Sequence, residues 1–119
     1  MTNMSKTKLA VNFFKTDSGV EPVRQWLKGL DQSDKKVIGE DIKTIQYGWP
    51  LGMPLVGFLG DGLWEVRTKL QNNRISRVLF ISENGLMVLV HGFIKKTPKT
   101  PKPDLDLARL RMKQLKGSK

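Results

Sequence analysis

The stretch LWEVRTKLQNNRISRVLFISENGLMVLVHGF, residues 63–93, decides the fold. It contains three runs rich in β-branched and aromatic residues, a composition that favours strands. These runs are residues 63–70, 75–82 and 86–93. Residues 71–74 connect the first two runs, and Asn84-Gly85 is a typical hairpin turn between the second and the third. The sequence therefore predicts an antiparallel meander of three strands.

The chain before this stretch predicts one short strand and two helices. Residues 9–14 are apolar, with β-branched and aromatic members, as in a strand. Pro22 suits the first position of a helix, and apolar residues follow at helical spacing: Val23, Trp26, Leu27 and Leu30. A second helix is expected from its N-cap Ser33 to Gly48. Its apolar stripe is Ile38, Ile42 and Ile45.

The remaining segments predict a loop, a linker and a last helix. Residues 49–62 are rich in glycine and proline and are expected to form a loop. Residues 97–103 carry prolines and lysines and predict a stiff linker, after which Pro103 or Asp104 begins a helix. The order β-α-α-β-β-β-α indicates an α+β fold with the meander packed on a helical hairpin. The length fits one domain over residues 1–119, with 1–8 flexible.

Composition excludes several kinds of site. The 119 residues include no cysteine and one histidine, His91, which excludes disulfides, a cysteine nucleophile and a multi-histidine metal site. We therefore expect neither cofactor nor metal. No apolar run reaches the length of about 18 residues that a membrane span requires. The N-terminus lacks the apolar core of a signal peptide, so we expect a cytoplasmic protein that does not bind membranes.

The net charge of +10 is concentrated in the second half of the chain. After residue 60 there are 13 basic and 5 acidic residues, and from Lys95 onward 9 basic and 2 acidic ones. A basic patch on a small domain is typical of a protein that binds a polyanion such as nucleic acid. A merely solvated tail, or an acidic protein partner, would account for the same charge.

Alternation along the strands predicts which side chains share a face. One set comprises Trp64, Val66, Thr68, Val78, Phe80, Val88 and Val90, and the opposite set comprises Glu65, Arg67, Lys69, Arg77, Leu79, Ile81, Met87, Leu89, His91, Phe93 and Lys95. We expect the first face to pack on the helical hairpin and the last helix to cover the apolar part of the second. The basic members of the second face would then converge on an open patch. Alternation does not fix the register between strands, and a bulge near Gly92 would turn Lys96 inward in place of Lys95.

Each charged residue of this face also has a structural explanation. Arg67 and Glu65 could form a surface pair of little energetic weight. Arg77 lies between apolar residues of a central strand, where it requires an anionic partner from the protein or from a substrate. His91 could be a core histidine, and the two lysines after the last strand could serve solubility alone.

A face of arginine, lysine and one histidine suits cleavage of RNA without a metal ion. A base takes the proton of the 2′-hydroxyl, which attacks phosphorus, while cations stabilise the developing charge and an acid protonates the leaving 5′-oxygen. The 2′-hydroxyl nucleophile makes RNA the substrate. A Mg²⁺ nuclease requires several acidic ligands in one place, and this face offers only Glu65.

Three motifs occur in order: LWEVR at 63–67, RVLF at 77–80 and HGFIKKTPKTP at 91–101. Together they resemble the RelE/ParE toxin superfamily, specifically the phage-related HigB-like branch of type II toxin–antitoxin systems, over residues 9–116. The resemblance implies a RelE-like fold and a toxin that cleaves mRNA on the translating ribosome without a metal ion. It also implies a cognate antitoxin, often a helix-turn-helix DNA-binding protein, with operator DNA bound only through the toxin–antitoxin complex.

The resemblance assigns roles by position. The candidate catalytic residues are Glu65, Arg67, Arg77, His91, Lys95 and Lys96. The two arginines are expected to bind and stabilise the scissile phosphate, and the last three residues lie where family members place acid and base groups. The base is open between His91, Glu65 and a lysine. RelE-type enzymes often use a tyrosine near the C-terminus, whereas the only tyrosine here is Tyr47.

Further basic residues are candidates for contacts with RNA or the ribosome: Lys69, Arg74, Lys99, Lys102, Arg109, Arg111 and Lys113. Two other functions fit the same chain. ParE-like members of the superfamily inhibit DNA gyrase and cleave no RNA. A non-catalytic module that binds nucleic acid through the basic C-terminal segment is the third alternative.

Overall fold

A mixed five-stranded sheet lies between two layers of helices in the computed structural model, which describes residues 8–52, 54–96 and 99–117. The strands are β1 (Ala10–Phe13), β2 (Val56–Gly60), β3 (Leu63–Lys69), β4 (Ile75–Glu83) and β5 (Leu86–Lys95), and their order in the sheet is β1-β5-β4-β3-β2. Only the β1–β5 pair is parallel. The helices are α1 (Pro22–Lys28), α2 (Gln32–Gly48) and α3 (Lys102–Gly117), with a short 3₁₀ turn η1 (Gln71–Asn73).

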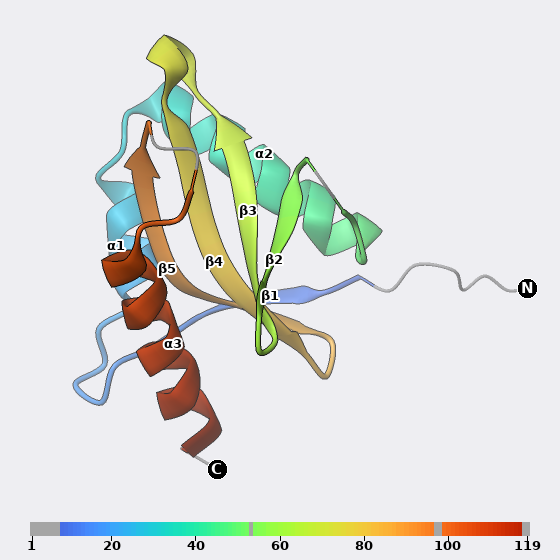
Figure 1. Cartoon of the computed structure of the whole chain (residues 1–119), viewed down its shortest axis with the longest axis vertical. Coiled ribbons are helices and arrows are strands. Elements are labelled where there is room, and N and C mark those ends of the chain that lie inside the picture. The colour runs from blue at the N-terminus through green and yellow to red at the C-terminus, as the bar shows by residue number, and fades with distance from the viewer. Residues whose placement is uncertain (1–7, 53, 97–98, 118–119) are drawn as a thin grey trace, which may run out of the picture.

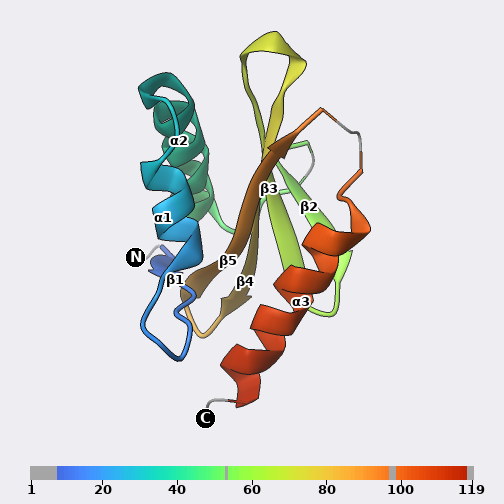
Figure 2. The same cartoon turned by 90° about the vertical axis from the view of Figure 1, so that its left-hand side faces the viewer.

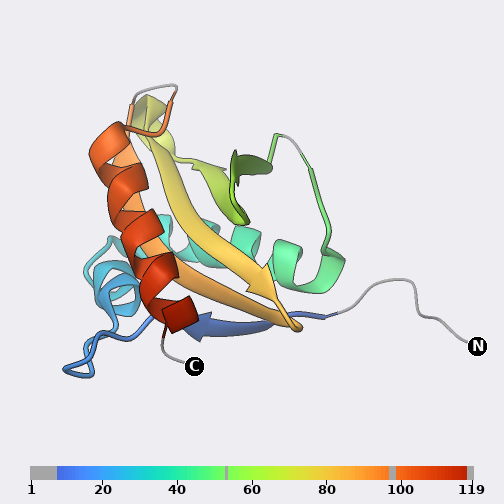
Figure 3. The ribbon, with the colours of Figure 1, turned by 60° about the horizontal axis from the view of Figure 1, so that its bottom comes forward.

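The two helical layers cover opposite faces of the sheet. Figure 2 shows α1 and α2 on one side and α3 on the other. On the hairpin side, Ile38 and Ile45 of α2 are fully buried in one cluster with Val66, Val78 and Phe80 of the sheet. On the other side, apolar residues of β4 and β5 pack against Ala108 and Met112 of α3, which runs along β5 (Figure 3). The predicted α+β architecture is therefore confirmed, and it is compatible with a RelE-like fold.

The expected loop over residues 49–62 was partly wrong, because it contains β2. Val56 and Phe58 of this strand pair with Val66 and Trp64 of β3. Two glycines in a strand of five residues remove most of the strand signal, since glycine has no side chain to pack on the sheet. Two helices begin one or two residues earlier than expected: the N-cap of α2 is Asp31 rather than Ser33, and α3 begins at Lys102 rather than at Pro103 or Asp104. The expectations for residues 1–7 and 97–98 lie outside the described residues.

A bulge in β5 corrects part of the predicted face assignment. Leu79 pairs with His91, but the next residue, Phe80, pairs with Leu89, so Val90 is an extra residue. Met87 and Leu89 consequently pack on the hairpin side, and Val88 and Val90 on the α3 side, which is the reverse of the expectation. The extra residue shifts the alternation by one. Beyond the bulge, Phe93 lies on the α3 side as expected, and His91 and Lys95 contact Asp104 of α3.

An ion pair ties the β3–β4 connection to α2. The guanidinium of Arg74 donates from Nη1 to Oδ2 of Asp34 at 2.8 Å and from Nη2 to Oδ1 at 3.1 Å. These hydrogen bonds hold the pKa of Asp34 below its usual value and raise that of Arg74. A two-point contact of this kind fixes orientation as well as distance. The hairpin end of β3 and β4 is thereby held against the first turn of α2.

Gly92 of β5 lies directly under the ring of Trp26, and this contact generates the first prediction. A Cβ atom at Gly92 would lie 2.5 Å from ring atom Cζ3 of Trp26. We expect Gly92→Ala to lower the free energy of unfolding by about 1–3 kcal/mol, because the partly buried ring, which packs against the core, must shift. Thermal or urea unfolding measures the change.

Gly39→Ala is the matched control, since no atom lies within 4 Å of a Cβ there and the residue is exposed in α2. Alanine at that helical position should raise stability by up to about 1 kcal/mol. Equal unfolding midpoints for the Gly92 variant and the wild type would contradict the packing of α1 on β5.

Candidate functional site

The candidate site lies on the face of the sheet that α3 covers, and the register of the strands determines which side chains meet there. The pairing of β3, β4 and β5 places three rows of side chains there. The rows are Glu65–Leu79–His91, Arg67–Arg77–Phe93 and Lys69–Ile75–Lys95. Neighbouring strands lie about 4.8 Å apart, so β3 and β5 are about 10 Å apart. The predicted residues therefore share one face, but they form two separate groups rather than one open patch, and Arg77 is buried.

The first group, the arginine cluster, consists of Glu65, Arg67, Arg77 and Thr100. Glu65 is 1% exposed. Its Oε2 accepts a hydrogen bond from Nε of Arg67 at 2.7 Å, and its Oε1 accepts one from Oγ1 of Thr100 at 2.6 Å. Nε of Arg77 lies 3.8 Å from Oε1. A buried carboxylate is stable only when its oxygens are paired in this way, so Glu65 organises the cluster.

The two arginines differ in access to solvent. Arg77 is 1% exposed, and its Nη1 donates to the carbonyl of Lys99 at 3.0 Å. Burial lowers the pKa of Arg77, the Glu65 carboxylate opposes this, and Arg67 adds to the lowering. The anionic partner that a buried arginine requires is therefore provided by the protein. The Arg67 side chain, in contrast, is 33% exposed.

Gly57 of β2 makes room for the guanidinium of Arg67. A Cβ atom at Gly57 would lie 3.2 Å from Nη2 of Arg67 and 3.3 Å from Oε2 of Glu65. A side chain on this edge strand would therefore displace the arginine. Gly57 is therefore one of the two glycines that weaken the strand signal of β2, and it leaves space for the side chain of Arg67.

The second group, the histidine cluster, consists of His91, Lys95 and Asp104. Nε2 of His91 lies 2.7 Å from Oδ1 of Asp104, and Nζ of Lys95 donates to Oδ2 at 3.0 Å. Burial opposes the charge of Asp104, but the hydrogen bonds from His91 and Lys95 outweigh it and hold the pKa of this carboxyl below its usual range. His91 also lines a separate hollow of about 150 Å³, together with Trp26 and Arg111.

Several predicted RNA-binding residues hold the fold together. Arg74 binds Asp34, Arg109 donates to the carbonyl of Leu59 at 2.7 Å, and Arg111 donates to the carbonyl of Val90 at 2.8 Å. The remaining basic candidates are exposed: Lys69, Lys95, Lys96, Lys99, Lys102 and Lys113. The surface available to a polyanion therefore consists of these lysines and of the partly exposed Arg67 and Arg109.

Sequence reasoning missed Thr100 and Asp104 as members of the two groups. Both follow the last strand, and the sequence showed them only as part of a linker and as a helix start. Their contacts, to Glu65 and to His91, depend on the direction in which the chain leaves β5 and on how α3 packs. A first-turn aspartate in a helix is ordinary, so the sequence carried no signal for its pairing.

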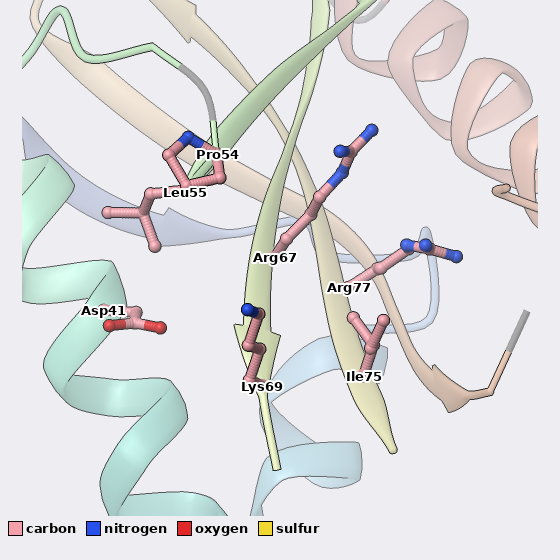
Figure 4. Close-up of a pocket in the computed structure, with 7 residues that line it drawn as sticks. All are labelled: Asp41, Pro54, Leu55, Arg67, Lys69, Ile75 and Arg77. Carbon is pink, nitrogen blue, oxygen red and sulfur yellow. The ribbon is translucent and has the colours of Figure 1, made fainter. Parts of the chain in front are cut away.

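A pocket of about 620 Å³ adjoins the arginine cluster (Figure 4). It is lined by Asp41, Pro54, Leu55, Arg67, Lys69, Ile75 and Arg77.

The end of β3 next to this pocket is not paired with β2. β2 begins opposite Val66, so within the described part of the chain the last two residues of β3, Thr68 and Lys69, have no strand partner on that side. We call them the open edge of β3. In Figure 4, Arg67 and Arg77 point away from α2, whereas Asp41, Pro54 and Leu55 lie on the α2 side of this edge.

The comparison with family models identifies the chain. Residues 25–113 match the model described as phage-derived protein Gp49-like (DUF891). This match covers well over half of the 119 residues. The chain belongs to the Gp49-like family. Gp49-like proteins are a RelE/toxin-like family, in agreement with the superfamily resemblance. A search of curated proteins finds no match.

The described part of this Gp49-like protein was also searched for metal-binding groups of side chains and for membrane-spanning helices. Among residues 8–52, 54–96 and 99–117, no three histidine, cysteine, aspartate or glutamate side chains lie close enough to hold a metal ion. In the same ranges no helix is long and apolar enough to cross a membrane. The charged groups that the described site offers to a ligand are guanidinium, ammonium, imidazole and carboxylate.

The depressed pKa of Asp104 generates a prediction about acid stability. A carboxylate of this kind contributes stability above its unfolded pKa, about 4, and the contribution is lost as the pH falls through the lower folded pKa. We expect Asp104→Asn to be less stable than the wild type at pH 7. Below about pH 4 the wild type should lose stability more steeply than the variant. Urea unfolding between neutral and acid pH measures both curves.

Asp106→Asn is the control for that experiment. Asp106 is on the same helix, and its side chain is 58% exposed in a pair with the exposed Lys102. An exposed pair of this kind contributes little. Parallel pH curves for the wild type and the Asp104 variant would show that the histidine cluster does not couple α3 to the sheet.

Proposed function

We propose that this Gp49-like protein is the toxin of a type II toxin–antitoxin system, of the HigB-like branch, and a metal-independent endoribonuclease. Its substrate is mRNA on the translating ribosome. The observation that carries the proposal is the arginine cluster. A partly exposed Arg67 lies at a pocket, fixed by a buried carboxylate and backed by a second, buried arginine.

The contacts of Arg67 suit it to a phosphodiester. Its Nε is occupied by Glu65, so its orientation is set before a ligand arrives. The two terminal nitrogens can donate to two phosphate oxygens at once, the geometry in which arginine binds phosphate best. A donor that is already oriented stabilises developing charge without a cost of reorganisation. This supports a role for Arg67 at the scissile phosphate.

In the proposed reaction the 2′-oxygen forms a bond to phosphorus and the bond from phosphorus to the 5′-oxygen breaks. The proton of the 2′-hydroxyl goes to a base, and the leaving oxygen receives a proton from an acid. The products are a 2′,3′-cyclic phosphate and a 5′-hydroxyl. Arg67 stabilises the negative charge on the pentacoordinate phosphorus, and Arg77 adds positive charge behind it.

The histidine cluster is our choice for the acid and base groups. Both oxygens of Glu65 are occupied, and the residue is buried, which leaves His91 and the lysines among the candidate bases. Asp104 orients the imidazole of His91, as a carboxylate does in other acid–base pairs. Lys95 lies two strands across the sheet and two residues along it from Arg67, so their backbones are about 12 Å apart, a span that long side chains and a dinucleotide can bridge.

The charge of the chain supports the proposed partners. A net charge of +10 favours the polyanionic ribosome. It also favours an antitoxin that places an acidic segment over the basic patch. In this proposal the antitoxin is a helix-turn-helix protein, and operator DNA is reached only through the complex.

Substitution of Arg67 tests the proposal. We expect Arg67→Ala to lower the rate of mRNA cleavage by about 100-fold or more, the usual effect of removing one oriented donor from a transition state. Arg67→Lys should be intermediate, because lysine keeps the charge and loses the two-point contact. The assay uses one 5′-labelled mRNA with translating ribosomes in magnesium, and a parallel arm with free RNA in EDTA.

Arg24→Ala is the control, since Arg24 is an exposed arginine of α1 paired only with Glu21. Unfolding curves of all variants show that the effects are not losses of folding. Growth arrest by a folded protein that leaves mRNA intact would overturn the nuclease in favour of gyrase inhibition. Salt-dependent RNA binding with neither cleavage nor toxicity would favour a non-catalytic module.

A further inference from the structure

We infer that the 620 Å³ pocket at the open edge of β3 binds one nucleobase of the RNA, and that the carboxylate of Asp41 selects guanine. This inference rests on the proposed function, because it concerns the RNA whose phosphate Arg67 would hold. It assigns a role to α2, which no part of the proposed cleavage reaction uses.

The inference depends on the position of Asp41 at the wall of the pocket. Asp41 is half-buried on α2 and lines the pocket. Its carboxylate makes no hydrogen bond or ion pair with the part of the chain that the structure describes. A partly exposed carboxylate at a pocket wall, with no partner in the described chain, is available to accept hydrogen bonds from a ligand in the pocket.

The other walls suit the flat, apolar faces of a base. Leu55 and Pro54 lie on the α2 side of the open edge and offer apolar surface there, whereas Ile75 of β4 lies across the edge. Small-ligand sites commonly combine apolar walls with one or two polar groups that fix orientation. Asp41 would supply the polar group that reads the edge of the base.

The base and the phosphate of a bound nucleotide would lie on opposite sides of the open edge of β3. In Figure 4, Asp41 and Leu55 lie on the α2 side of β3, whereas Arg67 and Arg77 point to the opposite side. The backbone of Arg67 is joined to this wall, because its N–H donates to the carbonyl of Leu55 at 2.8 Å. A nucleotide that crosses the edge would therefore place its base at Asp41 and its phosphate at Arg67.

The chemistry of a carboxylate favours guanine over the other bases. An ionised carboxylate only accepts hydrogen bonds, and its two oxygens match two parallel donors. The Watson–Crick edge of guanine carries two adjacent donors, N1–H and the N2 amino group. Adenine and cytosine present one donor beside an acceptor, and uracil presents one donor between two acceptors. In single-stranded RNA this edge is accessible.

The charges around the pocket favour RNA over a basic side chain of a protein partner. Arg67, Lys69 and Arg77 line the other part of the same pocket and add positive charge there, which disfavours a basic segment of a protein that would have to cross the edge to reach Asp41. A nucleotide satisfies both kinds of group, since its phosphate meets the cations and its base meets the carboxylate.

Binding of RNA that cannot be cleaved tests the inference separately from the nuclease. Short 2′-O-methyl oligonucleotides carry guanine, inosine or adenine at one central position among uridines, and fluorescence anisotropy at low salt gives each Kd. We expect the wild type to bind the guanine strand about 10-fold or more tightly than the adenine strand. Inosine, which lacks the N2 amino group, should bind with intermediate affinity.

Asp41→Asn should reduce the preference for guanine to about 2-fold or less, because an amide offers one acceptor in place of two. Glu40→Gln is the matched control, since Glu40 is the exposed neighbour on the same helix and the change in charge is the same. It should keep the preference of the wild type. Thermal unfolding of both variants shows that the fold is retained.

Three results would overturn the inference: equal binding of guanine and adenine strands by the wild type, an undiminished preference in Asp41→Asn, or no binding of any strand. A guanine preference that depends on Asp41 in a protein that cleaves no mRNA would keep the pocket and remove the nuclease. Cleavage that depends on Arg67, without any base preference, would keep the nuclease and remove the pocket.

Discussion

The buried carboxylate of Glu65 is the constraint on which the site depends. It pairs with Arg67 of its own strand, lies beside Arg77 of the next strand and accepts from Thr100 in the segment before α3. Removal of the Glu65 carboxylate would take the buried counter-charge away from Arg77, a change that costs about 3–5 kcal/mol in comparable cases. The orientation of the exposed arginine and the path of the chain into α3 are therefore determined together.

Local chemistry accounts for what the sequence could predict of the fold. Asn84 and Gly85 both adopt positive φ, as the hairpin turn between β4 and β5 requires, so the meander was readable. The strand β2 was not, because its glycines carry no strand signal. The extra residue Val90 was not predicted either, since hydrophobic alternation does not mark the position at which a bulge changes the phase.

The sequence predicts which residue types the candidate site contains, but it does not predict which of their side chains reach solvent. Alternation placed Glu65, Arg67 and Arg77 on one face, and the structure agrees. Composition does not show which cations also bind a backbone carbonyl, as Arg109 and Arg111 do. The partner of His91 lies 13 residues further along the chain, and its position follows from the packing of α3.

The ion pair between Arg74 and Asp34 also positions α2 beside the pocket. Asp34 and Asp41 are seven residues apart on one rigid helix, so the pair that holds α2 against the end of β3 and β4 also sets the distance between the two walls of the pocket. The walls are in place before a ligand enters. A ligand that enters such a pocket would lose less of its binding energy to ordering of the protein, because the walls are already tied together.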